Sequence, residues 1–128
     1  MSNARNIAGI TTDAVNASGE LVPVYACRAW AVFDGDLVTN PASATGIKDS
    51  GNVSTILDNG TNDYTVNFTN DMSTANYAIT GCAGQTDNGG NYKWFNVRLE
   101  APTVSKFRIL TPDSSNDQSN HTSIAVFC

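Results

Sequence analysis

The chain has 128 residues, a formal net charge of −5 and a pI of about 4.4, and only 15% of its residues are charged. This length suits one domain with one core. The acidic balance disfavours binding to a nucleic-acid backbone, which requires clustered Lys and Arg. No apolar run approaches the ~20 residues of a membrane-spanning helix. Abundant Asn, Thr, Ser and Gly favour short strands joined by polar turns over long exposed helices.

The N-terminal segment, residues 1–22, lacks strong periodicity and is dominated by Asn, Thr, Ala, Ser and Gly. This composition is typical of a linker or of the end of an upstream stalk. Its first residues contain no apolar stretch of the kind that a secretory signal carries. Whether they are native or an expression scar is left open by the sequence.

The first strand is predicted at 24–33, directly after Pro23. Both of its alternating faces are largely apolar, which predicts a strand covered on both sides, with Trp30 in the core. Arg28 is the exception, because a charge there is costly unless it is paired or lies in an interface.

A β-hairpin is predicted at 51–69. Tyr64, Val66 and Phe68 alternate with polar residues, the pattern of a strand with one buried face. The preceding run alternates less cleanly, which is consistent with a bulge. Between the strands lies an Asn-Gly turn, in which Asp58 is placed to accept a hydrogen bond from the turn backbone.

The whole chain is predicted to be all-β. Its short strands are separated by turn signals and no segment has helical periodicity, which favours an antiparallel β-sandwich of about seven or eight strands, or a barrel. The predicted strands span 24–33, 46–48, 52–57, 63–69, 76–83, 92–101, 104–111 and 121–128.

Several short strings in an ordered succession resemble the C-terminal domain of bacteriophage tail-fibre proteins, many of them from marine phages. The strings are Cys27-Arg28-Ala29-Trp30, Phe33-Asp34-Gly35, Gly51-Asn52-Val53-Ser54, Asp58-Asn59-Gly60-Thr61, Asp63–Thr69, Met72 with Ala75–Ala78, and Ile124–Phe127. The resemblance covers roughly residues 23–80 and, more weakly, the last strand. It implies a β-sandwich tip domain at 23–128, in a virion fibre that is usually trimeric and contacts the host surface. It brings no catalytic motif with it.

Catalytic and metal chemistry is not expected. His121 is the only histidine and no nucleophile-elbow motif accompanies the serines, so we expect it at the surface. One His with scattered Cys does not make a zinc site. Most Asp residues lie at turns, where turn chemistry explains them better than polysaccharide cleavage does. Asp34-Gly35-Asp36 and Asp113–Asp117 are candidate Ca²⁺ sites by their acidic composition, but neither has the spacing of a calcium loop. We therefore expect no enzyme activity, no metal and no cofactor.

Three cysteines, Cys27, Cys82 and Cys128, lack metal-like spacing, and their odd number argues against a complete disulfide framework. We expect three reduced thiols that act as small apolar residues, as in a protein assembled in a bacterial cytoplasm. A Cys27–Cys128 bridge is the alternative, because the first and last strands are candidates for neighbours.

If the strands alternate up and down, the connections 34–45, 58–62, 84–91 and 112–120 share one end of the sandwich. The stalk enters at Val24, so that end is distal. Long polar loops on a rigid scaffold are where binding residues usually lie, because Asn and Asp can hydrogen-bond sugar hydroxyls. The candidate receptor-binding residues are Asp87, Asn88, Asn91, Tyr92, Asp113, Ser115, Asn116, Asp117, Asn120 and His121. The alternative is that these residues only form solvated turns and bind nothing.

Two functions are compatible with this sequence. The first is a homotrimeric tail-fibre tip of the virion that binds a host-cell glycan or outer-membrane protein. The second is a structural trimerisation cap of the fibre, without a ligand of its own. Neither nucleic-acid binding nor membrane insertion is expected.

Overall fold

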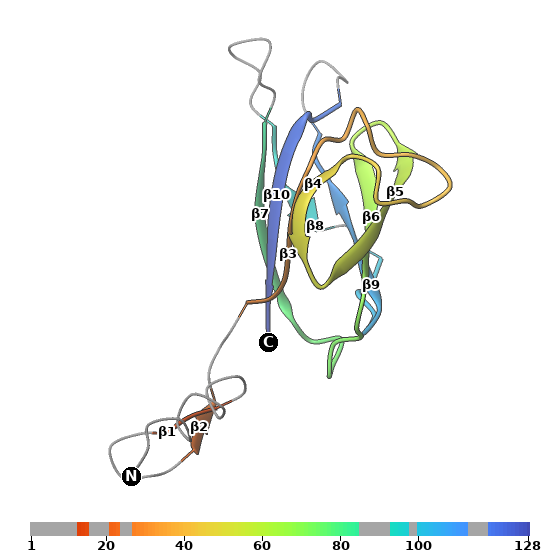
Figure 1. The fold of residues 1–128 in the computed structure, drawn as a ribbon. Coiled ribbons are helices and arrows are strands. Elements are labelled where there is room, and N and C mark those ends of the chain that lie inside the picture. The colour runs from red at the N-terminus through yellow and green to blue at the C-terminus, as the bar shows by residue number, and fades with distance from the viewer. Residues whose placement is uncertain (1–12, 16–20, 24–26, 85–92, 98–99, 113–117) are drawn as a thin grey trace.

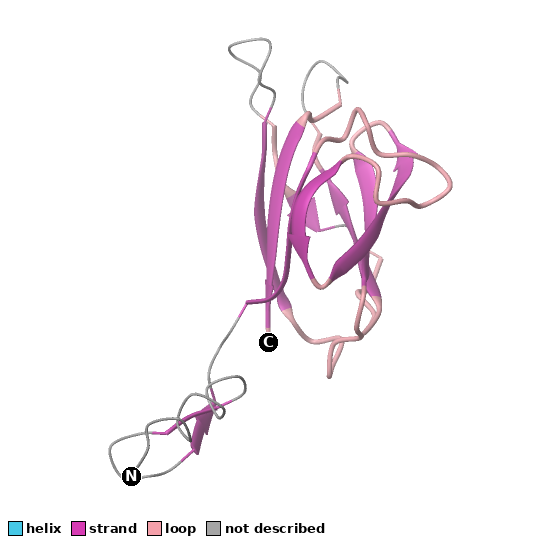
Figure 2. Cartoon of the chain, viewed as in Figure 1, coloured by secondary structure: helices cyan, strands magenta, loops and turns pink. Residues whose placement is uncertain are grey.

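The computed structural model describes residues 13–15, 21–23, 27–84, 93–97, 100–112 and 118–128. Every regular element among them is a β-strand (Figure 2). No helix long and apolar enough to cross a membrane occurs in these ranges. The prediction of an all-β protein is therefore confirmed.

The first four-stranded sheet has the order β4-β3-β10-β7, and all its neighbours are antiparallel. The last strand of the chain, β10, thus lies between β3 and β7 (Figure 1). The strands of this sheet are β3 (Cys27–Phe33), β4 (Ile47–Gly51), β7 (Ala78–Gly84) and β10 (His121–Phe127).

The second four-stranded sheet has the order β5-β6-β9-β8 and is also antiparallel. Its strands are β5 (Val53–Gly60), β6 (Asp63–Phe68), β8 (Asn96–Val97) and β9 (Lys106–Leu110). Together the two sheets form the predicted antiparallel β-sandwich of about eight strands (Figure 1). A separate two-stranded sheet pairs β1 (Asp13–Val15) with β2 (Leu21–Pro23), inside the segment for which the sequence predicted no element.

The core lies between the sheets and is supplied by alternate residues of their strands. Tyr64, Val66 and Phe68 of β6 are buried, as their alternation predicts. Phe33 of β3 packs edge-to-face on Tyr64, with the ring centroids 5.2 Å apart. Burying such aromatic and branched side chains is the main source of the sandwich's stability, at roughly 1.5–3 kcal/mol for each fully buried side chain.

The predicted hairpin at 51–69 is present and carries the predicted irregularity. The β5–β6 register shifts between Val53 and Thr55, which is the expected bulge. In the turn, the Gly60 amide donates to Asp58 Oδ1 at 2.8 Å, as expected. The strand is longer than predicted, because β5 continues through Gly60. The turn is closed at Asn62, whose φ is 60°.

Two further strands differ from their predicted bounds. Residues 49–51, expected to form a connection, belong to β4, and the turn lies instead at Asn52, which has a φ of 56°. The predicted strand 92–101 is reduced to Asn96–Val97 among its described residues. Among the described residues of this segment, Asn96 and Val97 pair with β9, and Phe95 packs against the core.

Strand β3 is covered on one face only, which corrects the prediction of a strand buried on both sides. Ala29, Ala31 and Phe33 are buried, whereas Trp30 on the opposite face is 38% exposed. Trp30 is therefore not a core residue. It lies over Gly51 of β4 on the outer face of the sheet, where a Cβ on Gly51 would overlap the indole nitrogen.

The strands alternate between two ends of the sandwich, as predicted. We call the end with Phe33, Gly84 and His121 the distal end, and the end with Cys27 and Phe127 the proximal end. In Figure 1 the C-terminus and the start of β3 lie at the proximal end. The connections after β3, β5, β7 and β9 leave from the distal end, and those after β4, β6 and β8 from the proximal end.

Candidate functional site

The distal end is held together by hydrogen bonds between connections that are far apart in sequence. The Gly35 amide, after β3, donates to the Ser119 carbonyl, before β10, at 2.7 Å. Ser119 Oγ donates to the carbonyl of Gly84, at the end of β7, at 2.8 Å. The Thr111 amide, after β9, donates to the Asn62 carbonyl at 2.9 Å. All four predicted distal connections are thus joined through residues at their ends.

The side chains that make these bonds are withdrawn from water. Ser119, Thr111 and Thr122 are 0% exposed. Thr122 Oγ1 donates to Ser119 Oγ at 3.0 Å, and Thr111 Oγ1 donates to Asn62 Oδ1 at 3.2 Å. Buried hydroxyls are stable only with such partners, so this network specifies one arrangement of the distal connections.

Tyr64 anchors the network to the core. Its hydroxyl donates to Gln118 Oε1 at 2.5 Å, and the same oxygen accepts from the Asn62 amide at 3.3 Å. Burial raises the pKa of the Tyr64 phenol above its ordinary value, and the nearby carboxylates of Asp58 and Asp36 raise it further. The phenol therefore stays neutral and remains a hydrogen-bond donor at physiological pH.

Eight of the ten predicted receptor-binding residues lie outside the described residues, in the segments 85–92 and 113–117. They are Asp87, Asn88, Asn91, Tyr92, Asp113, Ser115, Asn116 and Asp117.

The other two predicted site residues have different surroundings. His121 is exposed, and its Nε2 lies 3.5 Å from Ser123 Oγ. Asn120 is only 8% exposed, and its carbonyl accepts a hydrogen bond from Lys48 Nζ at 3.1 Å. Asn120 therefore supports the loop more than it offers a surface to a ligand. No local pattern predicts this contact, because Lys48 is 72 residues away.

Trp94 is an exposed aromatic residue at the distal end that the predicted site did not include. It is 65% exposed, the largest fraction among the exposed large hydrophobic residues described. Its amide donates to the Pro112 carbonyl at 3.0 Å, which places it beside the start of the connection that follows β9. The sequence carries a signal for this exposure, because polar Asn96 lies two residues further along, on the same face of the strand that was expected at 92–101.

The acidic turn at Asp34–Asp36 has structural partners. Asp34 Oδ1 accepts from the Asp36 amide at 3.1 Å, and Asp34 Oδ2 lies 3.4 Å from Lys48 Nζ. Turn chemistry and an ion pair thus account for the Asp34 carboxylate. The second acidic run, 113–117, lies outside the described residues. Within the described part of the chain, no group of three or more His, Cys, Asp or Glu side chains is placed to hold a metal ion.

All three cysteines are free thiols in the structure. Cys27 and Cys82 are exposed, which corrects the expectation that the cysteines serve as small apolar packing residues. β3 and β10 are neighbours, as the alternative of a Cys27–Cys128 bridge requires, and Cys27 is paired with Phe127.

Comparison of the chain with protein-family models, with curated proteins and with solved structures found no match.

Proposed function

We propose that this protein is the tip domain of a bacteriophage tail fibre and that its distal end binds a receptor on the host-cell surface, a glycan or an outer-membrane protein. The observation that carries the proposal is the distal end itself. Its four connections start from one buried hydrogen-bond network, and a 65%-exposed tryptophan stands beside them. A rigid base that presents polar segments and an aromatic ring is the usual form of a loop-built binding site.

The proposed chemistry is recognition rather than catalysis. The exposed ring of Trp94 offers an apolar face on which a sugar ring can stack, and tryptophan is among the residues that dominate binding energy at interfaces. The Asn- and Asp-rich segments 85–92 and 113–117 supply hydrogen-bonding groups for hydroxyls. In the virion, which is assembled in the host cytoplasm, this end would point away from the fibre shaft.

The proposal includes a homotrimer. The outer face of the β4-β3-β10-β7 sheet supports it, because apolar or small side chains stand on that face. Their strand partners place Trp30 beside Ala125 and Thr80, and Val32 beside Ser123 and Cys82. Trp30 and Phe127 are 38% and 37% exposed in the single chain. Packing such a face against other copies would remove it from water.

Receptor binding is tested by adsorption of the labelled protein to a panel of bacterial cells and by a glycan array. Trp94→Ala should abolish or strongly reduce binding, whereas Val104→Ala should not. Val104 is the matched control, an exposed apolar residue in the connection at the opposite end. Replacing 85–92 and 113–117 by short Gly-Ser turns should leave the oligomer intact and abolish adsorption.

Unchanged adsorption after loop replacement would contradict receptor binding at the distal end and would favour the alternative, a trimerisation cap with no ligand. Light scattering tests the shared part of both functions. A stable monomer at micromolar concentration would contradict the trimer and, with it, the cap.

A further inference from the structure

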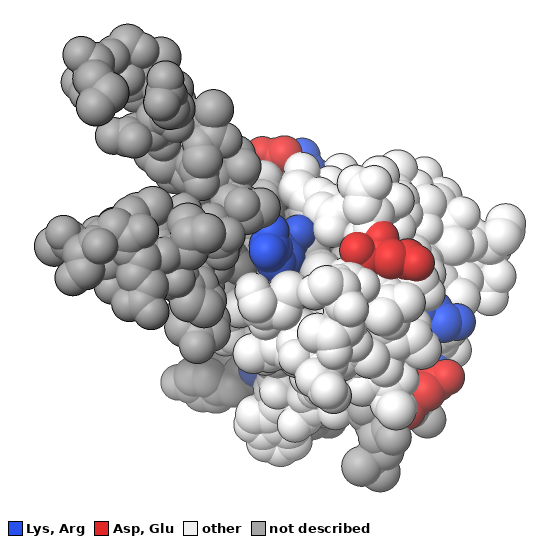
Figure 3. Space-filling model, turned by 90° about the horizontal axis from the view of Figure 1, so that it is seen from below, with Lys and Arg blue, Asp and Glu red and all other residues white. Residues whose placement is uncertain are grey.

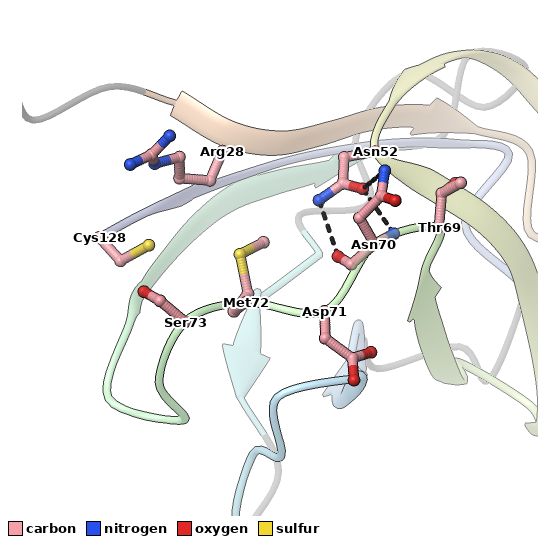
Figure 4. Close-up of a pocket in the computed structure, with 8 residues that line it drawn as sticks. All are labelled: Arg28, Asn52, Thr69, Asn70, Asp71, Met72, Ser73 and Cys128. Carbon is pink, nitrogen blue, oxygen red and sulfur yellow. Dashed lines mark hydrogen bonds between the residues drawn. The ribbon is translucent and has the colours of Figure 1, made fainter. Parts of the chain in front are cut away.

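A pocket of about 440 Å³ opens at the proximal end, on the opposite side of the sandwich from the proposed receptor site. It is lined by the start of β3, the residue after β10, the β4–β5 turn and the connection that follows β6 (Figure 4). Its volume falls within the range of about 300–1,000 Å³ that is usual for small-molecule sites. Seen from this end, most of the visible described surface carries no charged side chain, and the charges are scattered (Figure 3).

One wall of the pocket is a fixed pair of asparagines. Asn52 Oδ1 accepts from the Asn70 amide at 2.8 Å, and Asn52 Nδ2 donates to the Asn70 carbonyl at 3.1 Å. These two hydrogen bonds to the Asn70 backbone hold Asn52 in the left-handed region, with a φ of 56°. The Asn70 side chain is itself exposed and is presented at the rim. Both side chains are drawn on the same side of the pocket in Figure 4.

The floor is apolar and is supported by the backbone. Met72 is 6% exposed, and its amide donates to the Val104 carbonyl at 2.8 Å. In Figure 4 the Met72 thioether lies between the Asn52–Asn70 pair and Cys128. Ser73 continues this floor with an exposed hydroxyl-bearing residue. A ligand in the pocket would meet an apolar patch bordered by hydrogen-bonding groups.

Arg28 stands at the opposite rim and makes no ion pair or side-chain hydrogen bond with the described residues. It is exposed, so its guanidinium is available to a ligand anion. Guanidinium binds a carboxylate through two parallel hydrogen bonds, the strongest pairing that a single side chain offers to an organic acid.

Asp71 limits the charge that the pocket accepts. Its exposed carboxylate lines the same pocket, so the pocket carries one positive and one negative side chain. The chain as a whole has a net charge of −5. Both features disfavour a polyanion or a dianionic phosphate, since each added negative charge meets repulsion that Arg28 does not cancel.

We infer that the proximal pocket binds a monocarboxylated saccharide, of the uronic-acid type, with its carboxylate on Arg28, its hydroxyls toward Asn70 and Ser73, and its apolar ring face on Met72. This site is separate from the proposed receptor site at the distal end and does not depend on it.

The test is a titration of the full chain, followed by NMR at the backbone amides, with D-glucuronate, D-glucose, acetate and glucose 6-phosphate as the probes. Glucuronate should bind with millimolar affinity and shift the amides of Asn70 and Met72. Glucose, which carries a hydroxymethyl group in place of the carboxylate, should bind at least tenfold more weakly, as should acetate, which lacks the ring. Glucose 6-phosphate should bind more weakly than glucuronate because of Asp71.

Arg28→Gln should weaken glucuronate binding at least tenfold, whereas Lys106→Gln should leave it unchanged. Lys106 is the matched control, an exposed cation on β9 whose replacement changes the net charge by the same amount. Retained amide dispersion in the spectrum of the free variant shows that Arg28→Gln is folded. Equal affinity for glucuronate and glucose, equal affinity for acetate, or unchanged binding in Arg28→Gln would each overturn the inference.

Discussion

The two ends of the sandwich are made by the same strands, but polar side chains are buried at the distal end and exposed at the proximal end. At the distal end, Ser119, Thr111 and Thr122 are 0% exposed, and the hydroxyl of each donates a hydrogen bond to another residue of that end. At the proximal end, Arg28 and Asp71 are exposed at the rim of a pocket.

The difference follows from what each end must hold in place. Three long connections start from the distal end, and a buried hydrogen-bond network fixes their bases. The proximal end is closed by a short turn at Asn52 and by the connection at 69–77, so fewer buried partners are needed and side chains remain open to water. We therefore expect substitutions at the distal end to affect stability most, and substitutions at the proximal end to affect it less.

The largest effect is expected for Gly35→Ala at the distal end. A Cβ there would overlap the Tyr64 hydroxyl and would lie 2.5 Å from the Ser119 carbonyl oxygen, which is backbone and cannot move freely. We expect a loss of about 3 kcal/mol in the free energy of unfolding, measured by urea denaturation. Gly84→Ala at the same end is the control, because a Cβ there meets nothing within 4 Å. Equal stability of the two variants would show that the distal network is not tightly packed.

The next effect is expected for the ion pair beside the distal turn. Arg108 Nε and Nη2 donate to the two oxygens of Asp63 at 2.6 and 2.7 Å, and Asp63 is 8% exposed. This bonding raises the pKa of Arg108, which stays charged. Arg108→Gln leaves the Asp63 carboxylate without its bidentate partner. We expect a loss of about 2 kcal/mol, less than for a fully buried pair because the Arg108 side chain is 25% exposed.

Lys106→Gln on the same strand is the control for loss of a positive charge, and as a surface substitution it should change the free energy of unfolding by less than about 0.5 kcal/mol. If the two variants unfolded at the same urea concentration, the Arg108–Asp63 pair would contribute no more than a solvated surface charge.

A smaller effect is expected at the proximal turn. Asn52→Ala removes two hydrogen bonds to the backbone of Asn70 and leaves an alanine at a φ of 56°. We expect a loss of about 1–2 kcal/mol. Asn52→Gly removes the same hydrogen bonds but tolerates the positive φ, so it should be less destabilising than Asn52→Ala. The opposite order in thermal denaturation would show that the left-handed backbone contributes nothing to the cost.

The smallest effect is expected for Tyr77→Phe at the proximal end. The Tyr77 hydroxyl donates to the carbonyls of Thr103 and Lys106, at 2.8 and 3.1 Å, while the ring packs on Phe68 and Phe107. Tyr77→Phe keeps the ring contacts, so we expect a loss of about 1 kcal/mol at pH 7.

Tyr77→Phe should also change how the free energy of unfolding depends on pH. Burial raises the pKa of Tyr77 from 10.0 to about 12. The folded state therefore binds the phenolic proton more tightly than the unfolded state does. The resulting stabilisation is complete below pH 10 and is lost as the pH rises toward 12. Tyr77→Phe should lose less stability than the wild type between pH 10 and 12. Identical pH profiles of the two proteins would contradict the assignment.

The sequence by itself determined the approximate positions of most strands of the sandwich and the end at which each connection between them starts. Alternation at Tyr64, Val66 and Phe68 identifies a buried face from local pattern alone, because side chains alternate along any strand. Turn residues such as Asp58 and Gly60 mark chain reversal for equally local reasons. Once the strands are placed, antiparallel order distributes the connections, and this part of the candidate site was predictable.

Only the tertiary structure decided which surfaces the strands cover and which polar groups pair. Trp30 has the apolar neighbours of a core residue, yet its face of β3 is the outer one, because β3 packs its alanine face on the other sheet. Asn120 looks like a loop residue but is buried beside Lys48, and Arg108 meets Asp63 across 45 residues. Such contacts depend on the sheet order β4-β3-β10-β7 and β5-β6-β9-β8, which is set by non-local packing that no short pattern in the sequence encodes.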